Sequence, residues 1–100
     1  MLDLTSTGMR LHTHATLENC SSLLQQGQAL WPKLPSQGAI EIECGSLQQM
    51  DSSLLAILLE WQTQAQAESR QLHLKNAPEN LQHLAKLYDV DTWIDGLTST

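Results

Sequence analysis

The sequence is poor in positive charge. Its 100 residues include five Lys and Arg against eleven Asp and Glu, which gives a formal net charge of -6. A protein that binds nucleic acid needs clustered cations to displace the counterions of the phosphates, and an anionic membrane surface attracts the same kind of cluster. The composition therefore argues against nucleic acid and a membrane surface as partners, because the basic residues are scattered: Arg10, Lys33, Arg70, Lys75 and Lys86.

Cysteines and long apolar runs are also scarce. Cys20 and Cys44 are the only cysteines, and their spacing fits no CxxC metal or redox motif. The densest apolar stretch, residues 54–59, is far too short to span a bilayer. Residues 1–8 lack the basic and apolar regions of a signal peptide. We therefore expect a cytoplasmic chain with reduced thiols and no insertion into a membrane.

Motifs of catalysis are missing as well. The chain has no glycine-rich phosphate loop, no GxGxxG and no GxSxG. His12 and His14 share one strand face, but the sequence offers no third metal ligand at a useful spacing. Glu41 and Glu43 also share a strand face, but no pocket for catalysis is implied beside them. We interpret all four as solvated surface residues, and we predict no catalytic residue, no metal site and no cofactor.

Alternating apolar residues predict strands. Residues 9–15, 39–44 and 71–75 show this period of two, and Gly45 is expected to form the turn after the second strand. A short additional strand at residues 2–6 would precede them. Aromatic residues are few, with three Trp, one Tyr and no Phe. The core is therefore expected to consist of Leu, Ile and Ala.

Helical spacing predicts helices between these strands. The first follows Thr16, which is a suitable N-cap. The second occupies residues 52–68 behind Asp51, and the third begins at Pro78. Residues 92–97 suit either a short helix or a frayed tail. Strands that alternate with helices pair in parallel through right-handed crossovers. We predict an α/β fold in one domain, residues 1–100, with a sheet of about four strands covered by about three to four helices.

The helix at residues 52–68 is apolar over a wider arc than the ~100° stripe that a helix packed on a sheet needs. Leu55 and Leu59 lie to one side of its main apolar face, with Ser52 beside them. Two interpretations remain open. Either neighbouring helices cover both leucines, or the leucines form part of a partner-binding patch together with Ser52, Gln62 and Gln66.

The segment at residues 39–59 resembles the signature of the STAS family, which is named for sulfate transporters and anti-sigma-factor antagonists. The family pattern is a strand, a short loop, and then Asp-Ser or Asp-Thr at the start of an apolar helix. Here Asp51 and Ser52 match it. Leu54 stands where family members commonly carry Gly. Backbone geometry and the approach of a partner are therefore expected to differ at that position.

A second segment, residues 84–90, resembles the MlaB-type STAS subunits of Mla phospholipid ABC transporters through its Ala-Lys-Leu-Tyr sequence. This resemblance implies a non-catalytic subunit in the cytoplasm, peripheral to the inner membrane. It would bind an MlaF-like ATPase subunit and support the phospholipid transport that maintains outer-membrane lipid asymmetry. The partner-binding residues that we infer from the resemblance and the helical wheel are Asp51, Ser52, Ser53, Leu55, Leu59 and Gln62.

The family resemblance also implies an alternative function, that of an anti-sigma-factor antagonist. In that case an anti-sigma-factor kinase docks on the same surface and phosphorylates Ser52. The phosphate would add about -1.5 to -2 charges to the patch. Three interpretations of Ser52 therefore stay open: a contact residue, a phosphorylation site, or a helix-start hydroxyl without a signalling role.

Overall fold

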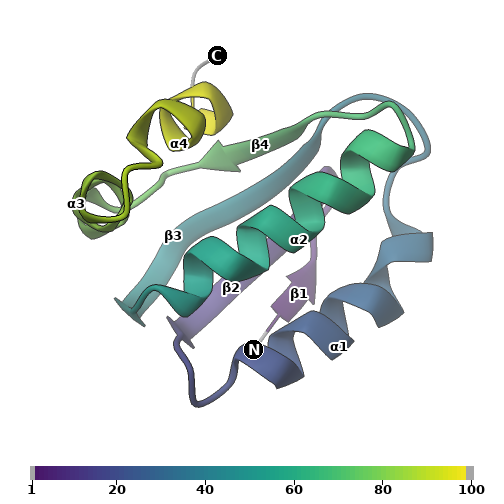
Figure 1. The fold of residues 1–100 in the computed structure, drawn as a ribbon. Coiled ribbons are helices and arrows are strands. Elements are labelled where there is room, and N and C mark those ends of the chain that lie inside the picture. The colour runs from purple at the N-terminus through teal and green to yellow at the C-terminus, as the bar shows by residue number, and fades with distance from the viewer. Residues whose placement is uncertain (1, 99–100) are drawn as a thin grey trace.

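The computed structural model describes residues 2–98. It contains one four-stranded sheet with the strand order β1-β2-β3-β4, and helices pack against it (Figure 1). The α/β class and the four strands predicted from the sequence are confirmed. The strands are β1 (Leu2–Leu4), β2 (Gly8–Ala15), β3 (Ile40–Met50) and β4 (Leu72–Lys75). The helices are α1 (Cys20–Leu30), the 3-10 turn η1 (Trp31–Lys33), α2 (Ser53–Ala67), α3 (Glu79–Leu87) and α4 (Asp91–Thr98).

The sheet is mixed. β2, β3 and β4 run parallel, as predicted for strands joined by helices, whereas β1 runs antiparallel to β2. Residues 5–7 are too few for a crossover and allow only a hairpin. In that hairpin the backbone N–H of Gly8 donates to Oγ1 of Thr5 at 3.0 Å. The N-terminal strand therefore closes one edge of the parallel sheet.

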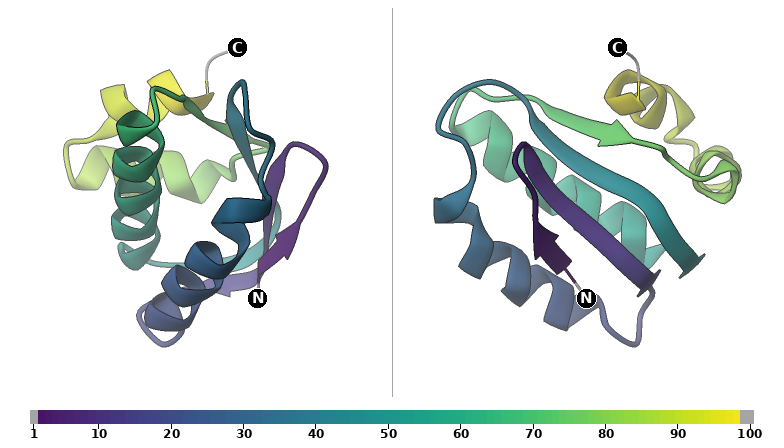
Figure 2. Two further views of the ribbon diagram at one scale, coloured as in Figure 1. Left: turned by 90° about the vertical axis from the view of Figure 1, so that its right-hand side faces the viewer. Right: turned by 180° about the vertical axis from the view of Figure 1, so that it is seen from behind.

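One face of the sheet carries the core, and the other is open. In β3 the side chains of Ile40, Ile42 and Cys44 are buried, whereas Glu41 and Glu43 point to the opposite face. The view from behind in Figure 2 shows the strands in front of α1 and α2, with no helix over them. The molecule is therefore a two-layer α/β domain, because the helices cover a single face.

β3 is longer than the sequence indicated. The strand was predicted to end at Cys44 with a turn at Gly45, but it continues to Met50, so that prediction is wrong. The additional residues pair with the second half of β2, where Ala15 lies opposite Met50. The register shifts twice along this pair, and Thr13, with a φ of 63°, projects to solvent instead of into the core. Pairing between strands, and not local pattern, sets the length of β3.

The start of α1 also differs from the prediction. Thr16 was predicted to cap the helix, but α1 begins at Cys20 and Asn19 precedes it, so that prediction is wrong. Residues 16–19 form a turn instead. The Asn19 side chain accepts the Thr16 N–H at 2.9 Å and donates to the carbonyl of His14 at 2.9 Å. These bonds satisfy the Thr16 N–H and the His14 carbonyl at the end of β2, and α1 begins only after this turn.

The C-terminal part of the chain forms α3 and α4 beside β4 (Figure 1). Pro78 lies immediately before α3, so the helix begins one residue later than predicted, at Glu79. The helical alternative for the segment after Val90 is confirmed, because Ile94 and Leu97 bury one side of α4. Within residues 2–98 no helix has both the length and the apolar character needed to cross a membrane.

Candidate partner-binding surface

Asp51 fixes the start of α2. Its Oδ1 accepts the backbone N–H of Ser53 at 2.8 Å, and its Oδ2 accepts the backbone N–H of Leu17 at 3.0 Å. These two hydrogen bonds, first that of Leu17 and then that of Ser53, hold the pKa of the Asp51 carboxyl below its usual value. Asp51 therefore satisfies a backbone N–H at the start of α2, and the same carboxylate attaches the turn at residues 16–19 to the helix.

Ser52 is exposed at the helix start. Its side chain makes no capping hydrogen bond, because Asp51 already satisfies the neighbouring N–H. The hydroxyl is therefore accessible to a partner or to a modifying enzyme. Ser53, the next residue, is half-buried.

Leu55 and Leu59 have different environments. Leu59 is 55% exposed, whereas Leu55 is only 9% exposed and belongs to the hydrophobic core. Four residues of helix turn the side chain by about 40°, which is enough to carry Leu59 past the edge of the packed face. The prediction that Leu55 lies on an exposed patch is therefore wrong, and the covered interpretation holds for that residue. The exposed interpretation holds for Leu59.

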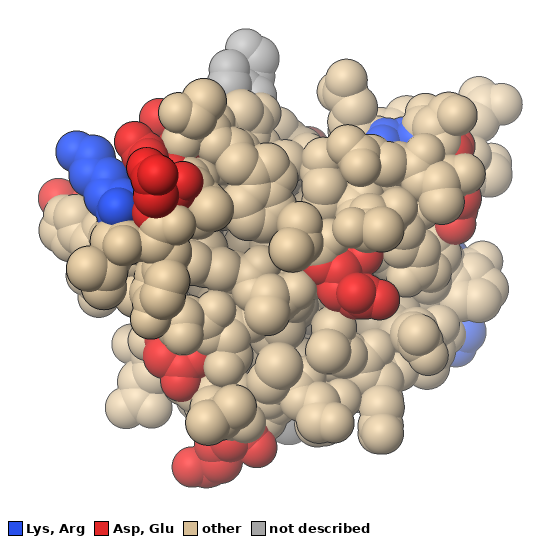
Figure 3. All heavy atoms as spheres, in the orientation of Figure 1, with Lys and Arg blue, Asp and Glu red and all other residues tan. Residues whose placement is uncertain are grey.

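The accessible part of α2 is a stripe of uncharged side chains. Ser52, Ala56, Leu59 and Thr63 are all exposed, and their spacing of four, three and four residues places them on one face of the helix. We call these four residues the α2 stripe. Figure 3 shows that the face formed by α1 and α2 is mostly uncharged, with separated acidic side chains. Sequence reasoning missed Ala56 and Thr63, although their helical spacing from Ser52 was visible.

Further apolar side chains are exposed near the start of α2 and at the end of α3. Leu17, which is bound to Asp51 through its backbone, is 79% exposed. At the end of α3, Leu87 is 75% exposed and Tyr88 is 53% exposed. A depression of about 260 Å³ lies between the end of β3 and α3, lined by Met50, Asn80, His83, Leu84 and Leu87. The segment at residues 84–90 thus borders the residue that precedes Asp51.

Two further residues singled out in the sequence lie away from the α2 stripe. Gln62 is half-buried, and its Oε1 is enclosed without a hydrogen-bond partner. Leu54 has no exposed surface, so the side chain that replaces the common Gly of the family fills the core. A partner can meet Leu54 only after the core has opened.

Comparison with known proteins identifies the family. A family model described as "Mlab, STAS domain" matches residues 2–98. The chain belongs to the STAS domain family. Proteins of this family are, in general, non-catalytic regulatory or interaction domains. No curated protein matches the STAS domain described here.

A solved structure has the same fold as this STAS domain. It is described as the anti-sigma factor antagonist SpoIIAA in its unphosphorylated form. The two superpose with a TM-score of 0.69 at 14% sequence identity, over 93% of this chain and 83% of that chain. At this identity the likeness concerns the fold alone.

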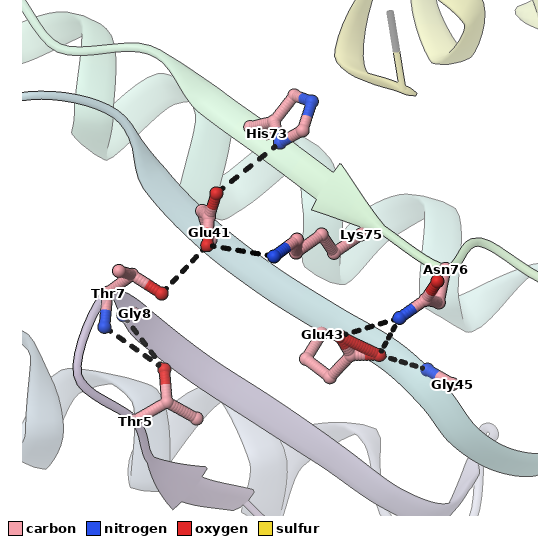
Figure 4. Close-up of polar contacts among 9 residues, drawn as sticks. All are labelled: Thr5, Thr7, Gly8, Glu41, Glu43, Gly45, His73, Lys75 and Asn76. Carbon is pink, nitrogen blue, oxygen red and sulfur yellow. Dashed lines mark hydrogen bonds and ion pairs between the residues drawn. The ribbon is translucent and has the colours of Figure 1, made fainter. Parts of the chain in front are cut away.

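The open face of the STAS domain carries a polar network, drawn in Figure 4. Glu41 accepts a hydrogen bond from the Thr7 hydroxyl at 2.7 Å, and Nζ of Lys75 and Nδ1 of His73 each lie 4.0 Å from its carboxylate oxygens. Glu43 accepts hydrogen bonds from Asn76 at 2.9 and 3.0 Å. Its pKa is lowered, mainly by Asn76. These carboxylates are held by their own neighbours, as expected for a surface network.

His12 of β2 interacts with the neighbouring strand β1. Nε2 of His12 lies 2.6 Å from Oδ2 of Asp3 on the adjacent strand, whereas the β2 register shifts before His14. Among residues 2–98 no group of three or more His, Cys, Asp or Glu side chains is placed to hold a metal ion.

Proposed function

We propose that this STAS domain is the non-catalytic subunit of an Mla-type ABC transporter. In this role it binds the transporter's ATPase subunit in the cytoplasm, peripheral to the inner membrane through that partner. It thereby supports the phospholipid transport that maintains outer-membrane lipid asymmetry. The observation that carries the proposal is the match of the MlaB-labelled family model to nearly the whole chain, residues 2–98.

The α2 stripe supports this proposal. A docking subunit needs an exposed surface and no active site of its own, and the stripe offers a large apolar side chain, Leu59, among small uncharged ones. Interfaces commonly have such an apolar centre within a more polar rim. Asp51 holds the turn at Leu17 beside Ser52, so a second exposed leucine stands next to the stripe. The ATPase is therefore expected to contact the stripe and this turn together.

The test is a pull-down of the purified Mla-type ATPase subunit of the same organism by the tagged STAS domain. Ser52→Asp and Leu59→Asp should each abolish capture, because both place a charge within the stripe. Leu4→Asp is the matched control, since Leu4 is 44% exposed on β1, whereas α2 contacts β3 and β4. Melting temperatures establish that all variants are folded. Failure of the wild-type domain to bind the ATPase would contradict the proposal.

One observation favours a second candidate function, that of an anti-sigma-factor antagonist regulated at Ser52. The Ser52 hydroxyl is exposed and makes no capping hydrogen bond, so a kinase can reach it. The fold match to SpoIIAA agrees with this candidate. A phosphate at the start of α2 would be favoured by the helix dipole and opposed by the adjacent Asp51 carboxylate.

Mass spectrometry of the domain isolated from its native host separates the two candidates. Phosphate on Ser52, together with a co-purified kinase that is an anti-sigma factor, supports the antagonist. Unmodified Ser52 together with a co-purified ATPase supports the transporter subunit. Ser52→Ala also separates the two candidates, because it removes the phosphorylation site that the antagonist needs but leaves the apolar contact of Leu59 intact.

A further inference from the structure

A cavity of about 400 Å³ lies between the C-terminal half of α2, the start of β4 and α4. Its walls combine amides, a hydroxyl, an indole and a guanidinium, which belong to Gln62, Gln66, Arg70, Gln71, Thr92 and Trp93. The volume is within the range of roughly 300–1,000 Å³ that is typical of small-molecule sites. The cavity adjoins the C-terminal half of α2, whereas Ser52 lies at the other end of that helix.

Arg70 is the unusual residue of this cavity. Its side chain is only 9% exposed. Nε donates to the carbonyl of Gly38 at 3.1 Å, and Nη1 lies 3.9 Å from Oε1 of Glu68. Nη2 is buried and has no hydrogen-bond partner. A guanidinium has five N–H donors and no neutral form in proteins, so burial leaves part of this cation unsatisfied.

The local counter-charge does not compensate Arg70 fully. The Glu68 side chain is 43% exposed, and its Oε2 accepts a hydrogen bond from Nε1 of Trp31 at 2.8 Å. Water and the indole therefore share this carboxylate with Arg70. A buried charge is tolerated when it is both paired and hydrogen-bonded, and here the pairing is long. An anion in the adjoining cavity would supply the missing negative charge and hydrogen-bond acceptor.

The other walls of the cavity complete the chemistry of a site. Oε1 of Gln62 is enclosed without a partner, so an acceptor stands unused at the same cavity as the unused donor of Arg70. Gln66, Gln71 and Thr92 add polar groups, and Trp93 adds an aromatic surface. Such a combination fits a ligand that has an anionic end, an apolar or planar body and a hydrogen-bond donor.

We propose that this cavity binds a small organic anion. The carboxylate or phosphate of the ligand pairs with Arg70 after the guanidinium turns its Nη2 toward the cavity. The body of the ligand lies against Trp93, and a hydroxyl or amino group of the ligand donates to Oε1 of Gln62 once that amide has likewise turned toward the cavity. Because α4 forms one wall, the ligand also stabilises the docking of the last helix on β4.

The test uses benzoate and phenyl phosphate as probes, with benzyl alcohol as the neutral analogue, all at constant ionic strength. Binding to the purified domain is measured by the saturable shift of backbone and indole N–H signals in NMR spectra. At least one anion is expected to shift the signals around Arg70 and Trp93, and benzyl alcohol to bind at least tenfold more weakly. Comparison of the two probes shows whether the head group is a carboxylate or a phosphate.

Two variants make the test specific. Arg70→Met removes the charge and keeps much of the packed volume, and it should weaken anion binding at least tenfold. Gly96→Leu fills the cavity without altering Arg70, because a Cβ at Gly96 meets no atom within 4 Å, and it should also prevent binding. The absence of saturable binding by either anion overturns the proposal. So does unchanged binding in a folded Gly96→Leu variant, even if Arg70→Met fails to fold.

Discussion

Gly27 of α1 faces the indole of Trp61 of α2, and a Cβ at position 27 would lie 2.7 Å from Nε1 of Trp61. Gly27 is buried, and Trp61 is 1% exposed. A glycine inside a helix costs about 0.5–1 kcal/mol relative to Ala. Here the missing side chain provides the space that the buried indole occupies, so the two helices can pack closely.

Gly27→Ala is therefore expected to destabilise the domain by about 1–2 kcal/mol, because the overpacking cost exceeds the gain in helix propensity. Urea unfolding followed by circular dichroism measures the change. Gly96→Ala in α4 is the matched control, since a Cβ there meets no atom within 4 Å. It should leave stability unchanged or raise it by up to ~1 kcal/mol. Stabilisation by both substitutions would show that the Gly27–Trp61 contact is loose.

The same substitution at two leucines of α2 should have opposite consequences. Leu55→Asp places a charge in the core and is expected to cost about 3 kcal/mol or more, whereas Leu59→Asp at an exposed position should change stability by less than about 0.5 kcal/mol. Thermal unfolding of the two variants checks this. Equal stability of the two variants would show that Leu55 is also at the surface.

Asp51 should contribute a pH-dependent part of the stability. Its pKa is lowered from 3.8 in the folded state, so the carboxylate stabilises the fold above pH 4 and this contribution is lost as pH falls through the folded pKa. Asp51→Ala is expected to cost about 1 kcal/mol at pH 7, and the gap to wild type should narrow below about pH 4. Urea unfolding at pH 7 and pH 3 measures both. A gap that is equally wide at pH 3 and pH 7 would contradict this role of the Asp51 carboxylate.

The two cysteines should differ in reactivity. Burial, assisted by the charge of Glu43, raises the pKa of the Cys44 thiol to about 12, whereas Cys20 is half-buried at the start of α1. In the folded protein at pH 8, a maleimide reagent should therefore modify Cys20 and leave Cys44 unmodified. Mass spectrometry of peptides locates the label. Rapid labelling of Cys44 without denaturant would indicate that the sheet and α2 separate readily.

Local pattern was sufficient for most elements of the fold. The helix at α2 was predicted at residues 52–68 and is observed at Ser53–Ala67, because a long apolar run without Pro or Gly has few alternatives. The second half of β3 has no alternation, since residues 45–50 are mostly polar or small. They become a strand only through pairing with β2, which lies more than thirty residues earlier in the chain.

The candidate sites were less accessible to sequence reasoning. Helical spacing put Leu55 and Leu59 on one side of α2 and left open whether both are covered. It could not separate Leu59 from Leu55, because that depends on how far the packed face of α2 extends. In the sequence Arg70 was one of several scattered cations. Its side chain bonds to Gly38, thirty-two residues earlier in the chain, and lines a cavity with residues of α4, which follows it. Side chains enclosed by distant segments leave no periodic signal.

The uncovered face of the sheet has a consequence for how the sequence of this chain can evolve. Along residues 40–44 of β3 and along β4, alternate residues either fill the core, as Ile42 and Leu74 do, or face solvent, as Glu43 and Lys75 do. A scan of all substitutions should therefore show tolerance that alternates at every second position. The solvent-facing set can exchange charge at little energetic cost. New recognition properties can thus arise on the open face while the helical face keeps its existing role.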